Sequence, residues 1–383
     1  MSVTAAKGFR AAGIAAGIKQ NGNPDLALVV NDGPRRAAAA VFTANRVKAA
    51  PVLWSEQVMK SGQVSAVVLN SGGANACTGP KGFQDTHATA EKAGEVLGRG
   101  AIEVAVCSTG LIGTLLPMDK VLPGIETAAA QLSEHGGEKA AIAIKTTDTV
   151  HKTSVVTQHG WTVGGMAKGA GMLAPGLATM LVVITTDADV DDATLDKALR
   201  AATRVTFDRV DSDGCMSTND TVLLLSSGAS GTTPDYDTFA DAVRQVCADL
   251  GRQLIGDAEG ASKDIKVEVV NAASEADAVE VGRSIARNNL LKCAIHGEDP
   301  NWGRVLSAIG TTGAVFEPDR LGVAINGVWV CRNGSVGEDR DLVDMRYREV
   351  HIVADLAAGT ETATIWTNDL TADYVHENSA YSS

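Results

Sequence analysis

The sequence predicts a mixed α/β protein in which β-sheets are covered by helices in layers. Short apolar runs typical of strands recur along the 383 residues, and segments with helical periodicity lie between them. Strict alternation of strand and helix is absent, so a doubly wound parallel sheet is not expected. The length favours two domains or lobes with ample material for a core.

Nine apolar runs are the strand candidates. The run at residues 180–184 is continuously apolar, which is typical of a buried strand. The candidates occupy residues 65–69, 103–107, 154–157, 180–185, 221–225, 265–270, 321–331, 350–354 and 363–366.

Two segments have a clear helical period. In residues 191–203, Leu195, Leu199 and Ala202 share one face behind acidic N-terminal residues. In residues 235–254, apolar residues recur at intervals of three and four. Residues 84–97 and 275–287 have weaker helical patterns.

Composition and charge restrict the class of protein. With 45% hydrophobic and 21% charged residues, the chain has the composition of a globular protein. Its 33 basic and 46 acidic residues give a net charge of −13, which disfavours a nucleic-acid or anionic-membrane partner. The first residues lack the apolar core of a signal peptide, and no segment has the apolar length to span a bilayer. We expect a cytoplasmic protein.

Motifs for metal, disulfide and nucleotide chemistry are absent from the sequence. The cysteines form no C-x-x-C pair and the histidines do not cluster, so neither a metal site nor any other cofactor is predicted. Gly169-Ala170-Gly171 resembles part of a dinucleotide loop, but it leads into Pro175 and a strand instead of a helix. Cys107 lies in an apolar run and is predicted to be a buried, reduced thiol. The six cysteines are Cys77, Cys107, Cys215, Cys247, Cys293 and Cys331.

Thr179 is the strongest candidate nucleophile. A Gly- and Pro-containing segment at residues 168–178 leads into it, and the predicted buried strand follows it directly. Cleavage of the Ala178–Thr179 bond would give Thr179 a free α-amine with an ordinary pKa of about 7.7–8.0. That amine can act as the base for its own hydroxyl. The small Ala178 suits the N-to-O acyl shift by which such bonds are cut. The alternative is an ordinary threonine at the start of a strand.

Other segments rich in small polar residues have both a functional and a structural interpretation. CSTGLIG at residues 107–113 follows a predicted strand and can aim backbone N–H groups and a hydroxyl at a developing negative charge, or form a plain turn. KTTDT at residues 145–149 can present hydroxyls to a substrate or form a capping cluster. HGEDPNWGR at residues 296–304 can be a binding loop or a surface loop with salt bridges.

Together these segments resemble one family, the arginine-biosynthetic glutamate N-acetyltransferases, also called ornithine acetyltransferases. The blocks occur in one order and span nearly the whole chain. They are LNSGGANACTG (69–79), CSTGLIG (107–113), TTDT (146–149), GGMAKGAGMLAPGLATML (164–181), DSDGCMSTNDT (211–221), GDAEGASK (256–263), GEDPNWGR (297–304) and NSAYSS (378–383).

The resemblance implies a layered α/β/β/α sandwich of the self-processing type, with a second α/β lobe. It implies cleavage between Ala178 and Thr179 into an α chain (residues 1–178) and a β chain (residues 179–383) that stay associated, as an α2β2 heterotetramer. The implied reaction is ping-pong: Thr179 takes an acetyl group from N2-acetylornithine, ornithine leaves, and glutamate accepts the acetyl group.

The resemblance also implies roles for individual residues. Thr109 and Gly110 would form the oxyanion hole. The residues implied to contact the amino-acid substrate are Thr146 or Thr147, Lys168, Thr179, Glu259, Asn378 and Ser383.

Chemistry supports these roles, although each residue also has an ordinary structural interpretation. Lys168 can pair with the substrate α-carboxylate or be a loop charge. Glu259 can pair with the ornithine ammonium or be a helix-end carboxylate. Asn378 and Ser383 can close the site around the acetyl ester, while chain ends such as Ser383 are commonly disordered.

Alternatives remain at this level. Gly176-Leu177 stand where relatives often carry Asn-Met, which leaves the efficiency of cleavage open. A bifunctional enzyme would also acetylate glutamate from acetyl-CoA, for which no coenzyme A site is recognisable. A self-processing amidase or aminopeptidase and an uncleaved binding protein are the other hypotheses. The primary arginine pathway and a secondary-metabolism copy are not distinguished.

Overall fold

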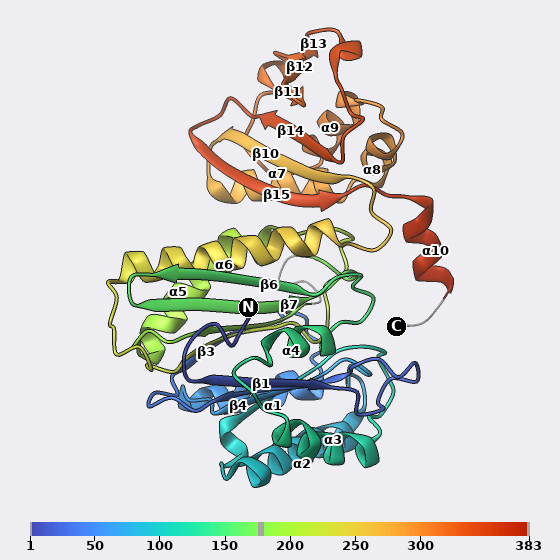
Figure 1. Cartoon of the computed structure of the whole chain (residues 1–383). Helices are drawn as coiled ribbons and strands as arrows, with labels where there is room; N and C mark the ends of the chain where they lie inside the picture. The colour runs from blue at the N-terminus through green and yellow to red at the C-terminus, as the bar shows by residue number, and fades with distance from the viewer. Residues whose placement is uncertain (1, 175–179, 381–383) are drawn as a thin grey trace. The chain divides into compact units, whose positions relative to one another are not determined.

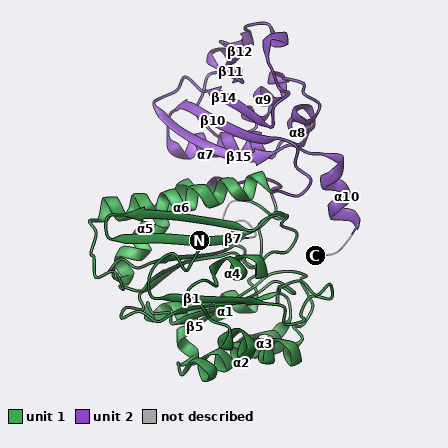
Figure 2. Ribbon diagram, viewed as in Figure 1, with its two compact units in different colours: residues 1–208, 215–257, 383 green, residues 209–214, 258–382 purple. Residues whose placement is uncertain are grey.

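A computed structural model describes residues 2–174 and 180–380. The described chain forms two compact units (Figure 2). Unit 1 comprises residues up to 208 and residues 215–257, and unit 2 comprises residues 209–214 and those from 258 onward. The second lobe predicted from the sequence is therefore present.

Unit 1 contains two β-sheets. In the first sheet the strand order is β1-β2-β4-β5, and only β4 and β5 run parallel. Its strands are β1 (Phe9–Ile14), β2 (Leu26–Asn31), β4 (Ala66–Asn70) and β5 (Val104–Ser108). In the second sheet the order is β3-β9-β8-β7-β6, and only β8 and β9 run parallel. Its strands are β3 (Ala38–Phe42), β6 (Lys152–Gln158), β7 (Trp161–Lys168), β8 (Leu181–Thr186) and β9 (Thr221–Ser226).

Helices cover the outer face of each sheet in unit 1, which gives the predicted α/β/β/α layers (Figure 1). The second sheet packs against α5 (Asp192–Val205) and α6 (Tyr236–Gly256). The first packs against α1 (Ala50–Val58), α2 (Gly79–Leu97) and α3 (Met118–Ala130). The short helix α4 (Gly137–Ala143) contacts strands of both sheets. One apolar core joins the two sheets, with side chains such as Leu28, Val67, Met166, Val183 and Leu223.

The two helices with the clearest sequence period begin at aspartate N-caps. Asp191 accepts a hydrogen bond from the Thr194 N–H at 2.8 Å, and Asp235 accepts one from the Thr238 N–H at 2.9 Å. A capping carboxylate satisfies an N–H that has no partner within the helix. This explains why the acidic residues that precede the apolar period marked the true helix starts.

Unit 2 contains one mixed sheet with the strand order β13-β12-β11-β14-β10-β15. The strands are β10 (Asp264–Ala272), β11 (Gly322–Ile325), β12 (Val328–Arg332), β13 (Ser335–Val336), β14 (Glu349–Asp355) and β15 (Glu361–Asn368). The helices are α7 (Glu275–Ala286), α8 (Asn289–His296), α9 (Trp302–Ile309) and α10 (Ala372–Ala380). Alternating burial along β10 shows that one face of the sheet packs on a core, which α7 and α9 complete.

Short 3₁₀ segments complete the description. They are η1 (Met59–Ser61), η2 (Ala101–Glu103), η3 (Phe207–Arg209), η4 (Pro318–Arg320) and η5 (Arg340–Leu342).

The prediction of a single strand over residues 321–331 is wrong. The segment forms β11 and β12, joined by a turn at Asn326-Gly327 in which both residues have positive φ, 47° and 87°. An Asn-Gly pair between apolar runs favours this tight hairpin turn because both residues tolerate left-handed backbone. Strands β1, β2, β3, β7 and β13 were not predicted.

Candidate active site

The predicted cleavage site lies in the connection between two paired strands. Lys168, the last residue of β7, is the antiparallel register partner of Leu181, the first residue of β8. Ala178 and Thr179 lie outside the described residues. The next residue, Met180, is buried, and its backbone is held on both sides. Its N–H donates to Asp220 Oδ1 at 2.9 Å, and its carbonyl accepts from the Thr221 N–H at 3.1 Å.

Thr109 and Gly110 follow the end of β5 directly. Thr109 is buried, donates its N–H to the Asn70 carbonyl at 3.0 Å and accepts the Gly73 N–H at 3.0 Å. Gly110 has φ of +130°, and a Cβ at this position would lie 2.7 Å from the Gly73 nitrogen. Only glycine fits such a backbone at this distance. The blocks at residues 69–79 and 107–113 therefore meet at the carboxyl ends of the parallel pair β4 and β5.

A buried asparagine that the sequence analysis did not single out connects these two blocks. Asn219 donates to the Ala74 carbonyl at 2.6 Å and to the Ser108 carbonyl at 2.7 Å. Ser108 Oγ donates to Asn70 Oδ1 at 2.5 Å, and Asn70 Nδ2 donates to the Gly73 carbonyl at 2.9 Å. These hydrogen bonds hold the backbone of Ser108, which precedes Gly110 in the chain, and that of Gly73, which lies against it.

Lys168 is a buried charge beside Thr109. Its side chain is almost fully buried, and Nζ donates to Thr109 Oγ1 at 3.3 Å. The structure thus brings together two residues that the sequence analysis assigned to the site, 59 positions apart in the chain. The interpretation of Lys168 as a surface loop charge is wrong, because the residue ends a buried strand.

Asp148 links Lys168 to the TTDT block. One carboxylate oxygen, Oδ1, accepts from Lys152 Nζ at 2.6 Å and from the Gly169 N–H at 2.7 Å, and Oδ2 accepts from the Thr146 N–H at 3.0 Å. Burial raises the pKa of Asp148, but the Lys168 and Lys152 ammonium groups and the Gly169 N–H outweigh it and hold that pKa well below its usual value. Asp148 is therefore a permanent anion at neutral pH.

Lys152 has a second carboxylate partner. Its fully buried Nζ lies 2.6 Å from Asp257 Oδ2, which also accepts the Thr149 N–H at 3.1 Å. This triad, Asp148–Lys152–Asp257, joins the chain after α4 to the end of α6. Thr146 and Thr147 are half-buried beside it, and which of them contacts substrate stays a prediction.

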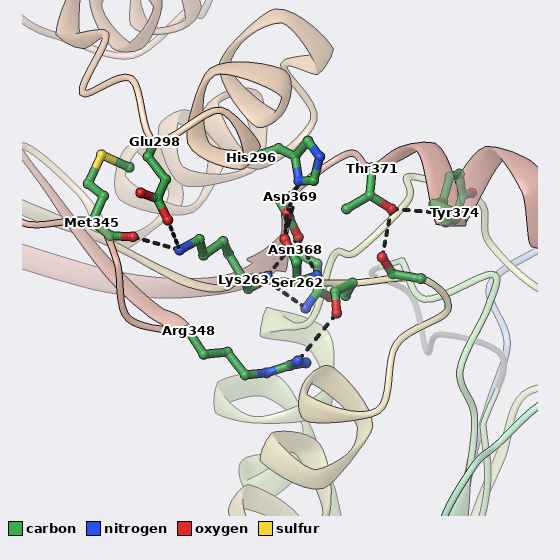
Figure 3. Close-up of polar contacts among 12 residues, drawn as sticks. Ser262, Lys263, His296, Glu298, Met345, Arg348, Asn368, Asp369, Thr371 and Tyr374 are labelled. Carbon is green, nitrogen blue, oxygen red and sulfur yellow. Dashed lines mark hydrogen bonds and ion pairs between the residues drawn. The ribbon is translucent and has the colours of Figure 1, made fainter.

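In unit 2, two residues implied as substrate contacts touch each other. Asn378, on α10, donates to Glu259 Oε2 at 3.0 Å. Thr371 links the segments that carry these two residues. Its Oγ1 donates to the Gly260 carbonyl at 2.6 Å and accepts the Tyr374 N–H at 2.9 Å (Figure 3). Gly260 has φ of +59°, and a Cβ there would lie 2.2 Å from the Tyr374 nitrogen. Ser383 lies outside the described residues.

A cavity of about 230 Å³ lies beside Glu259 within unit 2. Acidic, basic and amide groups line it together. Burial lowers the pKa of Lys292, although its Nζ donates a hydrogen bond to Thr367 Oγ1 at 3.4 Å. The charged and aromatic lining residues are Asp213, Glu259, Arg287, Lys292, Asp369 and Tyr374.

The GEDPNWGR block forms ion pairs. Lys263 Nζ donates to Glu298 Oε1 at 2.9 Å and to the Met345 carbonyl at 2.6 Å (Figure 3). Asp299 pairs with Arg340. These contacts support the interpretation of the block as a loop with salt bridges. Lys263 is the last residue of the GDAEGASK block, so its ion pair with Glu298 joins that block to the GEDPNWGR block.

Cys107 is a buried, free thiol, as predicted. Burial raises its pKa to about 12, so the thiol stays protonated and unreactive at neutral pH. In the part of the chain that the structure describes, His, Cys, Asp and Glu side chains form no group of three suited to a metal ion. No helix among the described residues has the length and apolarity to cross a membrane.

Comparison with known proteins identifies the family. The model of the ArgJ family matches residues 10–383. The chain is 87% identical over all 383 residues to the arginine biosynthesis bifunctional protein ArgJ of Streptomyces coelicolor, of which it covers 100%. The chain belongs to the ArgJ family. The ArgJ protein of Mycobacterium leprae is 59% identical, with 100% of this chain and 96% of that protein covered.

A solved structure is also similar. It is a crystal structure of ornithine acetyltransferase from Mycobacterium tuberculosis complexed with ornithine, with 60% sequence identity and a TM-score of 0.45. The match covers 47% of this chain and 96% of that chain. The resemblance to the ornithine acetyltransferases, and with it the class of acyltransferase in arginine biosynthesis, is confirmed by the full-length relatives.

Proposed function

We propose that this ArgJ-family chain is a cytoplasmic enzyme that transfers an acetyl group from N2-acetylornithine to glutamate through an acetyl ester on Thr179. The observation that carries the proposal is the contact between Lys168 and Thr109 in unit 1. The contact joins the end of β5 to the end of β7, the strand whose register partner β8 begins two residues after Thr179. A cation and a backbone turn suited to an oxyanion are therefore held at the end of β7, the strand that pairs with the first strand after the predicted nucleophile in the chain.

The proposed chemistry begins with cleavage of the Ala178–Thr179 bond. The bond lies in the connection between β7 and β8, so the predicted α chain supplies β3, β6 and β7 of the second sheet and the β chain supplies β8 and β9. The ladder hydrogen bonds between β7 and β8 do not depend on that peptide bond. This shared sheet supports the proposal that the two chains stay associated, as αβ pairs within an α2β2 assembly.

In the acetyl-transfer steps, the new Thr179 amine removes the hydroxyl proton as oxygen attacks the acetyl carbonyl. The N–H of Gly110 and the Thr109 hydroxyl would stabilise the tetrahedral oxyanion. Ornithine leaves with the proton on its α-nitrogen. Glutamate then attacks the acetyl ester by the reverse sequence, which regenerates the free hydroxyl.

Substrate recognition uses both signs of charge. Lys168 would bind the α-carboxylate that both amino acids carry, and Thr146 or Thr147 would add a hydroxyl. Glu259, oriented by Asn378, would bind the side-chain ammonium of ornithine. Asn378 and Ser383 near the C-terminus would help exclude water from the ester.

A second activity has one specific support. The curated relatives are named bifunctional proteins. In this chain we propose acetylation of glutamate from acetyl-CoA as that second activity, through the same acetyl-Thr179. An amidase or aminopeptidase activity has no comparable support.

The experiment compares wild type with Thr179→Ala by denaturing gel, mass spectrometry and an acetyl-transfer assay. We expect two fragments and transfer for the wild type, and one intact chain near 39.5 kDa without transfer for the variant. Transfer by Thr179→Ala would reject the proposed nucleophile. Transfer from acetyl-CoA in the wild type tests the second activity separately.

A further inference from the structure

The cavity beside Glu259 in unit 2 carries charges of both signs. Its volume of about 230 Å³ is smaller than the roughly 300–1,000 Å³ of pockets for drug-sized ligands, so it suits an amino-acid side chain. Two cations, Arg287 and Lys292, line this cavity together with Glu259. Among the described residues, the ion pair of Arg287 is with Asp211 and not with Glu259. The positive groups are therefore not explained by a pairing with the carboxylate proposed to bind ornithine.

Arg287 is anchored by one nitrogen and leaves the rest of its guanidinium unused. Nε donates to Asp211 Oδ2 at 2.7 Å, and the Asp211 side chain is fully buried while that of Arg287 is 47% exposed. Asp211 is itself fixed, because its N–H donates to the Trp366 carbonyl of β15 at 2.8 Å. Within the described part of the chain, the terminal nitrogens Nη1 and Nη2 donate no hydrogen bond. They form an edge that can bind a carboxylate through two parallel hydrogen bonds.

Two further features add positive charge at this cavity. Lys292 is buried, and its Nζ donates to the Ser212 carbonyl and, at 3.4 Å, to Thr367 Oγ1. An ammonium group has three N–H donors, so one is left for a ligand. Helix α8 begins at Asn289, another lining residue, and the start of a helix carries a partial positive charge.

Asp369, an acidic residue of the same lining, is occupied by its own contacts. Oδ1 accepts the Ser262 and Lys263 N–H groups at 2.9 and 2.8 Å. Oδ2 accepts from Ser262 Oγ and lies 3.0 Å from His296 Nδ1 (Figure 3). Glu259 differs, because only its Oε2 accepts a hydrogen bond among the described residues. The cavity thus offers a ligand a free carboxylate oxygen and a free guanidinium edge.

We propose that Arg287 and Lys292 form the subsite for the side-chain carboxylate of glutamate, in the cavity where Glu259 takes the ornithine ammonium. This role rests on the proposed function, in which one site exchanges the two amino acids. Ornithine and glutamate share an α-carboxylate and an α-nitrogen, but their side chains end in opposite charges. An enzyme that takes them in turn needs a partner of each sign for that end. With Glu259 alone, the cavity would repel glutamate.

The two half-reactions can be measured separately, and Arg287→Gln should affect only one of them. Glutamine removes the charge and the two-pronged edge. Release of ornithine from N2-acetylornithine without glutamate, measured per enzyme, should remain close to that of wild type. The KM for glutamate should rise about 10–100-fold, because charge-assisted hydrogen bonds are lost.

Free glutamine as the acetyl acceptor gives a readout that a merely structural role of Arg287 would not change. It is a neutral analogue of glutamate and loses only the charge-dependent part of the contact. In kcat/KM, wild type should prefer glutamate over glutamine by about 10–100-fold, and Arg287→Gln should lose most of that preference. A variant that keeps the wild-type preference would overturn the proposal. Equal use of both acceptors by wild type would overturn it even if the variant fails to fold.

Arg340→Gln is the matched control. Arg340 also pairs with an aspartate of unit 2, Asp299, and its side chain is 50% exposed, but it is not among the residues that line the cavity. We expect the wild-type KM for glutamate and the wild-type preference over glutamine. The same loss of preference in Arg340→Gln and Arg287→Gln would contradict a specific role for Arg287.

The failure of this subsite and the failure of the proposed function give different results. If wild type releases no ornithine from N2-acetylornithine and acetylates no glutamate, the proposed function fails, and the subsite with it. If wild type completes both half-reactions while Arg287→Gln still prefers glutamate as strongly, only the subsite fails.

Discussion

Replacement of Lys152 by methionine tests whether the Asp148–Lys152–Asp257 triad supports the active-site region. The Lys152 side chain is fully buried and its ammonium contacts both carboxylates at 2.6 Å. Methionine keeps most of the volume but leaves two buried carboxylates without their shared cation. Removal of one partner from a buried ion pair costs about 3–5 kcal/mol.

We expect the lower end of that range, because Asp148 keeps the Gly169 and Thr146 N–H groups and Asp257 keeps the Thr149 N–H. For a unit of this size, about 3 kcal/mol corresponds to a fall in Tm of roughly 6–12 °C. Differential scanning calorimetry of the purified protein measures it.

The control is Lys48→Met, which removes an ion pair with Glu56 in the same unit. Both side chains of that pair are 30% exposed, so its loss should cost less than about 1 kcal/mol. A Lys152→Met variant that unfolds at the temperature of Lys48→Met would refute the reasoning that the triad is an essential buried network.

Three further predictions concern the site. Gly110→Ala should lower kcat by about 10²–10³-fold, because the new Cβ would meet the Gly73 nitrogen at 2.7 Å and displace the oxyanion turn. The control is Gly113→Ala, which is also at positive φ but in open space and should change kcat far less. Equal losses of kcat in the two variants would count against the oxyanion role. Glu259→Gln should raise KM for N2-acetylornithine roughly 10–100-fold and that for glutamate less, since a charge-assisted hydrogen bond is lost; steady-state kinetics with each substrate decide this. The pKa of Asp148 is lower in the folded state, so its contribution to stability is complete above the unfolded pKa of about 3.9 and is lost as pH falls below it. Asp148→Asn should therefore show a smaller fall in Tm between pH 6 and pH 3 than wild type, and an equal fall would contradict that assignment.

The apolar runs of β8 and β9 were predicted from the sequence, whereas the similar run of β2 (LALVVN) and the strands rich in alanine and glycine were missed. β8 and β9 contain runs of Val, Leu and Ile, which are typical of strands buried on both faces. β3 (AAAVF) and β7 (WTVGGMAK) contain small residues with low strand propensity. Their strand conformation depends on pairing with β9 and with β6 and β8, information that a local pattern does not contain.

The site was predictable in part, through the family resemblance. The structure brings Thr109 to Lys168 and Glu259 to Asn378, residues that the sequence analysis had grouped only by role. Asn219 and Asp220 were missed, because a buried asparagine or aspartate looks the same in sequence as one in a surface turn. The partnership of Lys152 with Asp257 spans 105 positions and has no local signal.

The most direct test of the central claim is to locate the acetyl group on the processed enzyme. The enzyme is incubated with N2-acetylornithine labelled in its acetyl group, without glutamate, and its peptides are sequenced by mass spectrometry. The account predicts one labelled acetyl group on a fragment that begins with Thr179, and its loss to N-acetylglutamate when glutamate is added. Label on another side chain, or full transfer by an uncleaved chain of 39.5 kDa, would contradict it.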